Sequence, residues 1–401
     1  MSEWKIITAE EFCDSVMDGT HDTPKPTESG YKLVTGKHLK KGVIDDTDAY
    51  YISESDYNKI NERSKVDQWD VLMSMIGTVG EVAVVKNKPC YAIKNVALFK
   101  CAGSELKGRW LAYYLNSPKA KGFFTGNQKG SSQQFLSLKQ LRNLPILVTE
   151  EPYMKYVVDI LSRYDSLIEN YQKQIKLHEE AAQRLYKEWF VDLHFPGHEN
   201  TNILDGVPEG WEKKKLCEFT GITDGTHDSP KQVEIGLPLV TGRCIVDGRI
   251  DFSQAYNISE EDVIKINKRS AVEDGDILLS NIGTIGKVCR ISKSGNYAVK
   301  NMIIFKPHDA IHSCFLHRFL TDNNTQMDFL QQAAGTSQKF VSLSFIRNTL
   351  ILRPSDTILN LFYNHSEKYF NYVQILQSQL CLLTEARDRL LPKLMSGEIE
   401  I

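Results

Sequence analysis

The feature that most constrains the fold of this chain is an internal repeat. The motif Asp-Gly-Thr-His-Asp at positions 18–22 recurs at 224–228, an offset of 224 − 18 = 206. The same offset carries Leu-Val-Thr-Gly from 33–36 onto 239–242. One residue is lost near position 105, and the register then persists to the end of the chain. A repeat of this length indicates that one plan, large enough for a domain, was used twice.

Each copy begins with a segment of mixed secondary structure. Residues 71–76 are apolar except for Ser74, and a glycine-containing turn at 77–80 separates them from a second apolar run at 82–85. This pattern predicts a strand, a turn and a second strand. Residues 108–115 have helical character. Short strands mixed with a few helices indicate the α+β class.

A long helical segment follows each globular segment. Residues 153–193 contain no Gly or Pro, and apolar side chains recur at alternating spacings of four and three. That spacing is typical of a coiled-coil seam, and the repeat produces a second seam near the C-terminus. His178 and Arg387 replace apolar residues in the seams. We expect these polar side chains to fix the register of the helices.

These patterns predict an α+β protein in which two repeated globular domains are separated by two long antiparallel coiled-coil helices. A pseudo-two-fold axis would then relate the two copies. The expected boundaries are a first globular domain at 1–151, a central long helix at 152–195, a second globular domain at 196–354 and a C-terminal long helix at 355–401.

Composition narrows the class of protein. The first residues lack the basic flank and apolar run of a secretory signal, and no later stretch approaches the length of a membrane span. We therefore expect a cytoplasmic protein without a membrane partner. The eight cysteines show no C-x-x-C pair and no histidine at zinc-finger spacing. They predict reduced, mostly buried thiols and no structural metal.

Three segments resemble the specificity subunits of type I restriction-modification systems. Residues 185–196, Leu-Tyr-Lys-Glu-Trp-Phe-Val-Asp-Leu-His-Phe-Pro, are similar to the central conserved segment of that family. Residues 389–399, Arg-Leu-Leu-Pro-Lys-Leu-Met-Ser-Gly-Glu-Ile, are similar to its C-terminal segment. Residues 207–211, Val-Pro-Glu-Gly-Trp, resemble the entry of its second recognition domain. Together with the repeat, the resemblance covers the whole chain.

The resemblance implies that both globular domains are target recognition domains. Each would read one half of a bipartite target in double-stranded DNA, while the helices set the spacer and dock two methyltransferase subunits. Restriction subunits can join such a complex. The chain itself would be non-catalytic and hold no cofactor, because S-adenosylmethionine, ATP and Mg²⁺ would bind only to the partner subunits.

The residues agree with a non-catalytic role. The sequence has no phosphate-binding loop, no Asn/Asp-Pro-Pro-aromatic motif and no H-x-E with a downstream cysteine pair. The net charge of −3 and the pI near 6.4 require any DNA-binding surface to be locally basic or shared with a partner. An alternative of another class is a duplicated-domain scaffold that binds protein or glycan and has no DNA role.

Candidate DNA contacts lie in loops that combine lysine, amide and hydroxyl side chains. Such loops suit DNA because Gln can bond adenine at two atoms and Lys can bond phosphate or guanine. A solvated polar loop is the alternative for each. The first copy contributes His21, Lys25, Thr35, Lys37, His38, Lys40, Lys41, Lys94, Asn95, Gln128, Lys129, Ser131, Ser132, Gln133 and Gln134. The second copy contributes His227, Lys231, Thr241, Arg243, Lys300, Asn301, Thr336, Ser337, Gln338 and Lys339.

The repeated Asp-Gly-Thr-His-Asp motif allows three interpretations. Histidine beside carboxylates can shuttle protons, which would suit an acid-base site. The motif can equally be a turn in which Gly19 and Gly225 have positive φ and the Asp side chains bond the local backbone. It can also be a loop that faces DNA, and the last two interpretations are compatible.

The copies differ directly after the repeated Thr-Gly. The first copy continues Lys-His-Leu-Lys-Lys at 37–41, and the second continues Arg-Cys-Ile-Val-Asp at 243–247. These surfaces cannot present the same electrostatic field. We therefore expect half-sites that are related but not identical and lie in inverted orientation. The second half-site would have fewer phosphate contacts.

Overall fold

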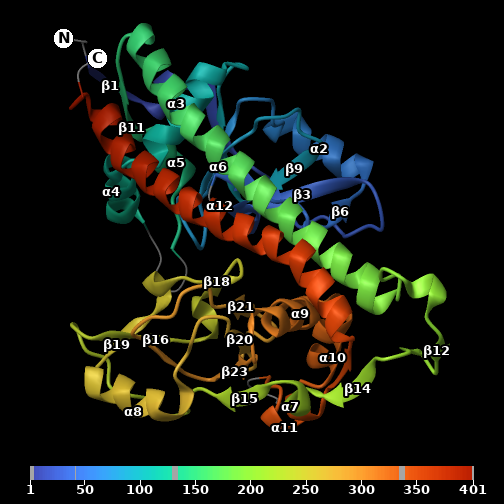
Figure 1. Cartoon of the computed structure of the whole chain (residues 1–401). Coiled ribbons are helices and arrows are strands. Elements are labelled where there is room, and N and C mark those ends of the chain that lie inside the picture. The colour runs from blue at the N-terminus through green and yellow to red at the C-terminus, as the bar shows by residue number, and fades with distance from the viewer. Residues whose placement is uncertain (1–3, 41, 129–133, 334–338, 400–401) are drawn as a thin grey trace. The chain divides into compact units, whose positions relative to one another are not determined.

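The chain divides into two compact units. The computed structural model describes residues 4–40, 42–128, 134–333 and 339–399. Unit 1 comprises Met1–Asn170 together with Leu380–Ile401, and unit 2 comprises Tyr171–Gln379. Two long helices, α6 (Glu151–Tyr186) and α12 (Asp356–Ser396), each contribute to both units (Figure 1).

Among its described residues, unit 1 contains eleven strands and five shorter helices besides its parts of α6 and α12. The strands are β1 (Lys5–Thr8), β2 (Ser15–Asp18), β3 (Tyr31–Thr35), β4 (Leu39–Lys40), β5 (Val43–Ile44), β6 (Tyr51–Ile52), β7 (Val71–Ser74), β8 (Val82–Val84), β9 (Tyr91–Lys94), β10 (Val96–Lys100) and β11 (Pro145–Val148). The helices are α1 (Ala9–Phe12), α2 (Glu54–Ser64), α3 (Glu105–Leu115), α4 (Pro118–Asn127) and α5 (Leu138–Arg142), with a 3₁₀ turn η1 (Gly36–His38).

Unit 2 contains counterparts of these elements together with additional short strands and helical turns. Its strands are β12 (Ile203–Leu204), β13 (Val207–Pro208), β14 (Glu212–Lys215), β15 (Gly221–Asp224), β16 (Leu237–Val240), β17 (Ile245–Val246), β18 (Arg249–Ile250), β19 (Tyr256–Ile258), β20 (Ile277–Ser280), β21 (Val288–Arg290), β22 (Ala298–Val299), β23 (Met302–Lys306) and β24 (Leu350–Arg353). Its helices are α7 (Leu216–Phe219), α8 (Glu260–Ser270), α9 (Ala310–Thr321), α10 (Asn323–Gln331) and α11 (Leu343–Asn348), with short helical turns η2 (Lys187–Val191), η3 (His198–Asn200), η4 (Gly242–Cys244) and η5 (Phe252–Gln254).

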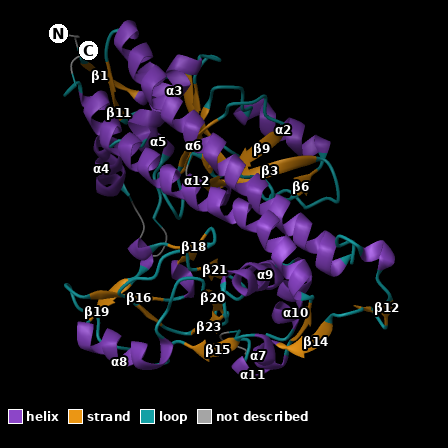
Figure 2. Ribbon diagram, viewed as in Figure 1, coloured by secondary structure: helices purple, strands orange, loops and turns teal. Residues whose placement is uncertain are grey.

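The sheets of the two units have the same topology. In unit 1 an antiparallel sheet has the order β2-β10-β7-β8, and a second sheet has the order β6-β3-β9 with β3 and β9 parallel. In unit 2 the corresponding orders are β15-β23-β20-β21 and β19-β16-β22. Helices and strands are mixed in each unit (Figure 2), which confirms the predicted α+β class.

Local sequence explains these elements. Strands β7 (Val-Leu-Met-Ser) and β10 (Val-Ala-Leu-Phe-Lys) lie inside the sheet and are largely apolar on both faces. Strands β7 and β8 confirm the strand, turn and strand that the sequence predicted at 71–85. Helix α2 begins after Ser53, whose side chain accepts from the Asp56 amide, and α8 begins in the same way after Ser259. Serine at this position satisfies an amide that the helix leaves unbonded.

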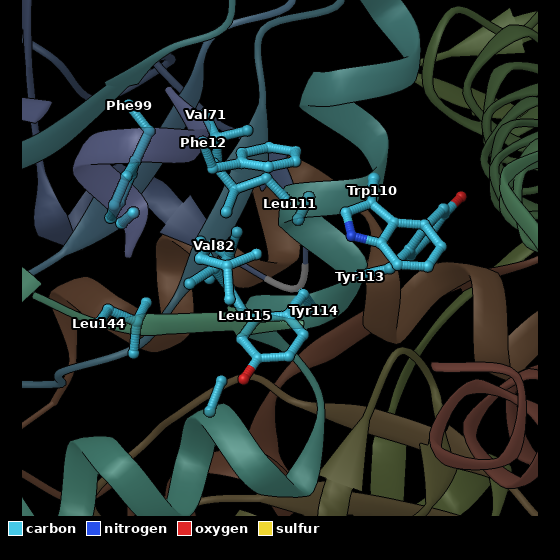
Figure 3. Close-up of a cluster of buried hydrophobic side chains, with 14 of the residues drawn as sticks. Phe12, Val71, Val82, Phe99, Trp110, Leu111, Tyr113, Tyr114, Leu115 and Leu144 are labelled. Carbon is cyan, nitrogen blue, oxygen red and sulfur yellow. The ribbon is translucent and has the colours of Figure 1, made fainter. Parts of the chain in front are cut away.

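The core of unit 1 packs α3 against the larger sheet (Figure 3). Trp110 of α3 is completely buried together with Phe99 of β10, and its ring nitrogen donates to the Leu147 carbonyl at 3.1 Å. Burial of the ring and a partner for its single donor both stabilise this helix against the sheet. The core of unit 2 is built in the same way around Phe305 and Phe315.

Within each unit, α6 and α12 run in opposite directions. In unit 1 the Tyr153 hydroxyl near the start of α6 donates to the Leu394 carbonyl near the end of α12. In unit 2 the relation is reversed, because Tyr186 at the end of α6 contacts Phe362 near the start of α12. The polar seam residues have partners in the helices: His178 stacks on Tyr372, and Arg387 donates to Asp165.

All eight cysteines are free thiols, and five of them are buried, which confirms the expectation of mostly buried thiols. Among the residues that the structure describes, no helix has both the length and the apolar character needed to cross a membrane.

Candidate nucleic-acid interface

The Asp-Gly-Thr-His-Asp motif forms a loop that leaves β2 and lies against the junction of β9 and β10. The amide of Gly19 donates to the Val96 carbonyl at 2.9 Å, and the amide of Thr20 donates to the Ile93 carbonyl at 3.0 Å. A Cβ atom on Gly19 would lie 2.4 Å from the oxygen of Ile93. Glycine is therefore needed for close approach of two backbones.

The expectation of positive φ at Gly19 and Gly225 was wrong. Neither glycine is among the described residues with positive φ, whereas Asn95 and Asn301 have φ of 53°. The Asp side chains also do not bond the local backbone as expected, since Asp18 bonds two other side chains. The left-handed residue at this site is the Asn that faces the loop, a residue type that tolerates this conformation.

A four-residue polar network holds the loop in unit 1. The His21 ring places Nε2 2.9 Å from the Asp18 carboxylate and Nδ1 2.7 Å from the Asn95 side-chain oxygen. Arg63, from α2, donates to the other carboxylate oxygen of Asp18. Because a carboxylate only accepts hydrogen bonds, Nε2 carries the proton in this contact. The network ties the loop, the start of β10 and α2 together.

Unit 2 contains the same network with the corresponding residues. His227 places Nε2 2.7 Å from Asp224 and Nδ1 3.0 Å from the Asn301 side-chain oxygen. Arg269 from α8 donates to Asp224 at 3.0 Å and to the Gly225 carbonyl at 3.2 Å. The repeat in the sequence is thus also a repeat of side-chain geometry.

A pocket opens between this loop and the neighbouring helix in each unit. The pocket volumes are about 540 Å³ in unit 1 and about 530 Å³ in unit 2. The first is lined by Thr20, Asp22, Thr23, Pro24, Lys25, Asp56, Lys59, Ile60, Arg63 and Ser64. The second is lined by Thr226, His227, Asp228, Ser229, Pro230, Asp262, Lys265, Ile266, Arg269 and Ser270.

The repeated Lys-Asn pair also faces the pocket loop. The Lys94 amine donates to the hydroxyl of Thr23, and the Lys300 amine donates to the hydroxyl of Ser229 at 2.6 Å. Neither lysine has a carboxylate partner among the described residues. The structure therefore brings together His21, Lys25, Lys94 and Asn95, which the sequence had proposed as separate DNA contacts.

The segment after β3 is less available to DNA than its sequence indicates. Lys37 lies 3.3 Å from Asp48, and Lys40 lies 3.3 Å from Asp45. The hydrogen bond from Lys37 lowers the pKa of Asp48. Bonds from the hydroxyl and amide of Thr47, and then from Lys40, lower the pKa of Asp45 to about 2. Both carboxylates are therefore ionised near neutral pH and compensate the two lysines.

His38 has a structural position. Its ring is 1% exposed, and Nδ1 accepts from the Thr35 amide at 2.8 Å. Burial lowers the pKa of His38, so the ring is neutral near pH 7. In unit 2, Cys244 takes this position, and Thr241 and the exposed Arg243 flank it. A ring without exposed surface cannot reach a base, so His38 is not part of the interface.

The amide-rich loops are only partly described. Gln128 ends α4, and the carbonyls of Gln134 and Lys339 accept from the amides of Gly77 and Gly283, which places the two loops equivalently. The remaining candidates lie outside the described residues, namely Lys41, Lys129, Ser131, Ser132, Gln133, Thr336, Ser337 and Gln338.

Sequence reasoning missed the basic residues that α2 and α8 supply. Lys59 and Arg63 lie on α2, and Lys265 and Arg269 occupy the same places on α8. The signal was present, because Lys-Ile-Asn-x-Arg-Ser occurs at 59–64 and again at 265–270. Identity between two copies at exposed positions could have identified these residues.

The chain is similar to known proteins in sequence and in fold. Residues 1–179 match the family model described as the type I restriction modification DNA specificity domain. The MjaIX specificity subunit of Methanocaldococcus jannaschii is 25% identical over 354 residues, which cover 82% of this chain and 78% of that protein. The MjaVIII specificity subunit of the same organism is 23% identical over 417 residues, which cover 100% and 93%.

A solved structure has the same fold. The crystal structure of the type I restriction-modification S subunit from M. genitalium matches with a TM-score of 0.58 and 15% identity, over 98% of this chain and 96% of that one. The chain is therefore similar to type I restriction-modification specificity subunits, in its first 179 residues by the family model and along its length by the relatives.

Proposed function

We propose that this chain is the non-catalytic DNA sequence-recognition subunit of a type I restriction-modification complex. Each unit reads one half of a bipartite target in double-stranded DNA, and the two half-sites are similar and inverted. The main observation behind the proposal is that the loop, the polar network and the pocket occur twice. Two copies of one site suit a DNA target that contains two similar half-sites. The globular domains at 1–151 and 196–354 act as the target recognition domains.

The long helices set the distance between the half-sites and dock two methyltransferase subunits, to which restriction subunits can be added. Large apolar side chains remain exposed along α6 and α12, which supports a docking role. They are Tyr156, Leu167, Leu177, Leu361, Tyr372, Ile375 and Leu382. S-adenosylmethionine, ATP and Mg²⁺ bind to the partner subunits in this proposal, and the chain supplies recognition alone.

An electrophoretic mobility shift with and without methyltransferase subunits tests the proposal. The complex should bind a duplex that carries the bipartite target far more tightly than a scrambled duplex at physiological salt. Absence of any sequence preference in both conditions would contradict the proposal and favour a scaffold that binds protein or glycan.

The proposed ruler can be tested by lengthening both helices. Seven residues inserted after Asn170 in α6 and after Gln379 in α12 add about 10 Å at 1.5 Å per residue. They also keep each helix face in nearly the same direction. The preferred spacer should grow by about three base pairs at 3.4 Å each, with both half-sites unchanged. A changed half-site would contradict the division of labour between helices and domains.

A further inference from the structure

The two pockets are almost the same in composition. At every lining position that the pockets share, the residues are identical, except that Thr23 in unit 1 corresponds to Ser229 in unit 2. This substitution keeps the hydroxyl. The two volumes also agree, at about 540 and 530 Å³. At these shared positions the pockets therefore offer the same kinds of donors and acceptors to a ligand.

The neighbouring surface of each unit has diverged. The segment 37–48 contains three lysines and three aspartates, whereas its counterpart 243–254 differs at most positions. Exposed side chains in a duplicated chain drift apart unless both copies need the same contact. The conserved pocket therefore suits a group that is common to both half-sites. The diverged segment does not need to bind such a common group.

The pocket lysines are free to bind an anion. Lys25 and Lys59 form no ion pair with any described residue, in contrast to Lys37 and Lys40 of the same unit. In unit 2, Lys265 lines the pocket and Lys231 follows Pro230, and both also lack a carboxylate partner in the described part of the chain. A lysine without a partner can contact an anion without first breaking an ion pair.

Most carboxylates near the pocket already have partners. Asp18 accepts from His21 and Arg63, and Asp56 accepts from the Ser53 hydroxyl at 2.7 Å. Asp22 is the remaining lining carboxylate in unit 1. The lining of the unit 1 pocket holds Lys25, Lys59 and Arg63 against Asp22 and Asp56. The lining of the unit 2 pocket holds Lys265 and Arg269 against Asp228 and Asp262, and Lys231 beside Pro230 adds one further cation. The surface is therefore locally basic in a chain whose net charge is −3.

We propose that each loop–helix pocket binds phosphates of the DNA backbone, one at each lysine, through Lys25 and Lys59 in unit 1 and through Lys231 and Lys265 in unit 2. The proposal rests on the proposed function and deepens it. A backbone phosphate is the group that all half-sites share whatever their bases, which explains why both units keep this pocket. Thr20 and Thr23 add hydroxyls, and the network around Asp18 positions the loop.

A pair of variants with equal loss of charge tests the assignment. Lys25→Ala with Lys59→Ala removes two positive charges from the pocket, and Lys37→Ala with Lys40→Ala removes two from the diverged segment of the same unit. Binding of the complex with methyltransferase subunits to cognate and scrambled duplexes is measured by fluorescence anisotropy over a salt series. Circular dichroism and thermal unfolding establish that both variants fold like the wild type.

The pocket variant should bind cognate and scrambled DNA more weakly by the same factor. Its slope of log K against log salt should fall by about two, because each phosphate contact contributes about 0.9. The ion-paired control should change the slope by less than half as much. Lys59→Ala and Lys265→Ala should each reduce the slope by about one, and their effects should add.

Three results would overturn the assignment. They are an unchanged slope in the pocket variant, an equal or larger change in the ion-paired control, and a loss of affinity confined to cognate DNA, which would make the pocket a reader of bases. The proposed function fails separately, if the wild-type complex binds DNA without sequence preference. The salt slopes would still decide where the phosphates bind in that case.

Discussion

The two units keep the same loop–helix pocket but differ along the segment that follows β3 in unit 1 and β16 in unit 2. In the pocket, Lys59 and Arg63 correspond to Lys265 and Arg269. In the following segment, Lys40 corresponds to Val246. The difference separates two requirements within one fold. Under the proposed assignment, side chains that any DNA needs are kept in both units, whereas those that distinguish one half-site from the other can change.

The units also hold their long helices differently. In unit 1, Asp165 of α6 accepts from the Tyr113 hydroxyl at 2.7 Å and from Arg387 at 3.0 Å. In unit 2, Arg290 of β21 donates to both carboxylate oxygens of Glu367 in α12, at 2.6 and 3.1 Å. The Arg290 side chain is 5% exposed, whereas that of Arg387 is 26% exposed. The helix anchor of unit 2 is the more buried of the two.

The largest expected effect comes from removing the carboxylate in each anchor. Glu367→Ala leaves a buried guanidinium unpaired and should lower the free energy of unfolding by about 3–5 kcal/mol. Asp165→Ala should lower it by about 1–3 kcal/mol, because Arg387 keeps Asp388 as a partner. Urea unfolding followed by tryptophan fluorescence and circular dichroism measures both. An equal or smaller cost for Glu367→Ala would contradict this difference between the anchors.

The second effect comes from exchanging the diverged segment. Replacing residues 37–48 by residues 243–254 should change the bases that unit 1 prefers, with a cost of about 1–3 kcal/mol for each base whose hydrogen bonds the exchange removes. The salt dependence should change little, since the pocket remains. A methylation assay on a library of half-site variants measures the preference. An unchanged first half-site would show that this segment does not read bases.

A third effect tests the close approach in the loop. Gly19→Ala places a Cβ 2.4 Å from the Ile93 oxygen and should cost about 1–3 kcal/mol of stability. The same change at Gly225 should have the same cost, because its Cβ would lie 2.4 Å from the Val299 oxygen. Gly122→Ala, in α4 with open space around it, is the control and should be neutral or stabilising. Thermal unfolding of the three variants measures these differences in stability. A Gly19→Ala variant as stable as the wild type would show that the loop does not require glycine at this position.

The smallest effect concerns the pH dependence of unit 1. Burial lowers the pKa of His38 below the value of about 6.5 that is usual for histidine. The folded state therefore resists protonation while the unfolded chain accepts it, so stability is complete above about pH 6.5 and is lost as pH falls toward the lower pKa of the folded ring. The loss amounts to at most about 1.4 kcal/mol per pH unit.

His38→Cys, which introduces the residue of the second unit, should remove this part of the pH dependence. The measurement is the difference in unfolding free energy between wild type and variant at several pH values, from about 7 down to about 5. Desolvation also lowers the pKa of His317 in unit 2, but this residue is present in both proteins and its effect cancels in the difference. A difference that does not change with pH would contradict the role assigned to His38.

The sequence predicted the fold better than the site. The repeat, the α+β class, the strands around residues 71–85 and the two long helices followed from periodicity and turn residues, because these patterns reflect local structure. The loop residues His21 and Asn95 were also predicted from the sequence. They come from copies of short motifs that are identical in both halves of the chain.

The missed features depend on contacts between distant segments. Arg63 reaches Asp18 from a helix 45 residues away in sequence, and the pairing of Lys37 with Asp48 follows from how the intervening loop folds back. Likewise, position 19 requires glycine because the backbone of a neighbouring strand lies too close for a Cβ atom, and not because the residue has a positive φ. Local patterns do not determine which surfaces meet. Charge alone therefore overestimated how available the lysines at 37–41 are to DNA, and it missed the basic residues on α2.

The central claim is that the two units read two similar half-sites in inverted orientation. The most direct measurement is a map of methylated bases in DNA treated with the complex of this chain and its methyltransferase subunits. We expect one bipartite motif, with two similar inverted halves separated by a spacer of fixed length and no preferred sequence. A contiguous motif, or two unrelated half-sites, would contradict the claim.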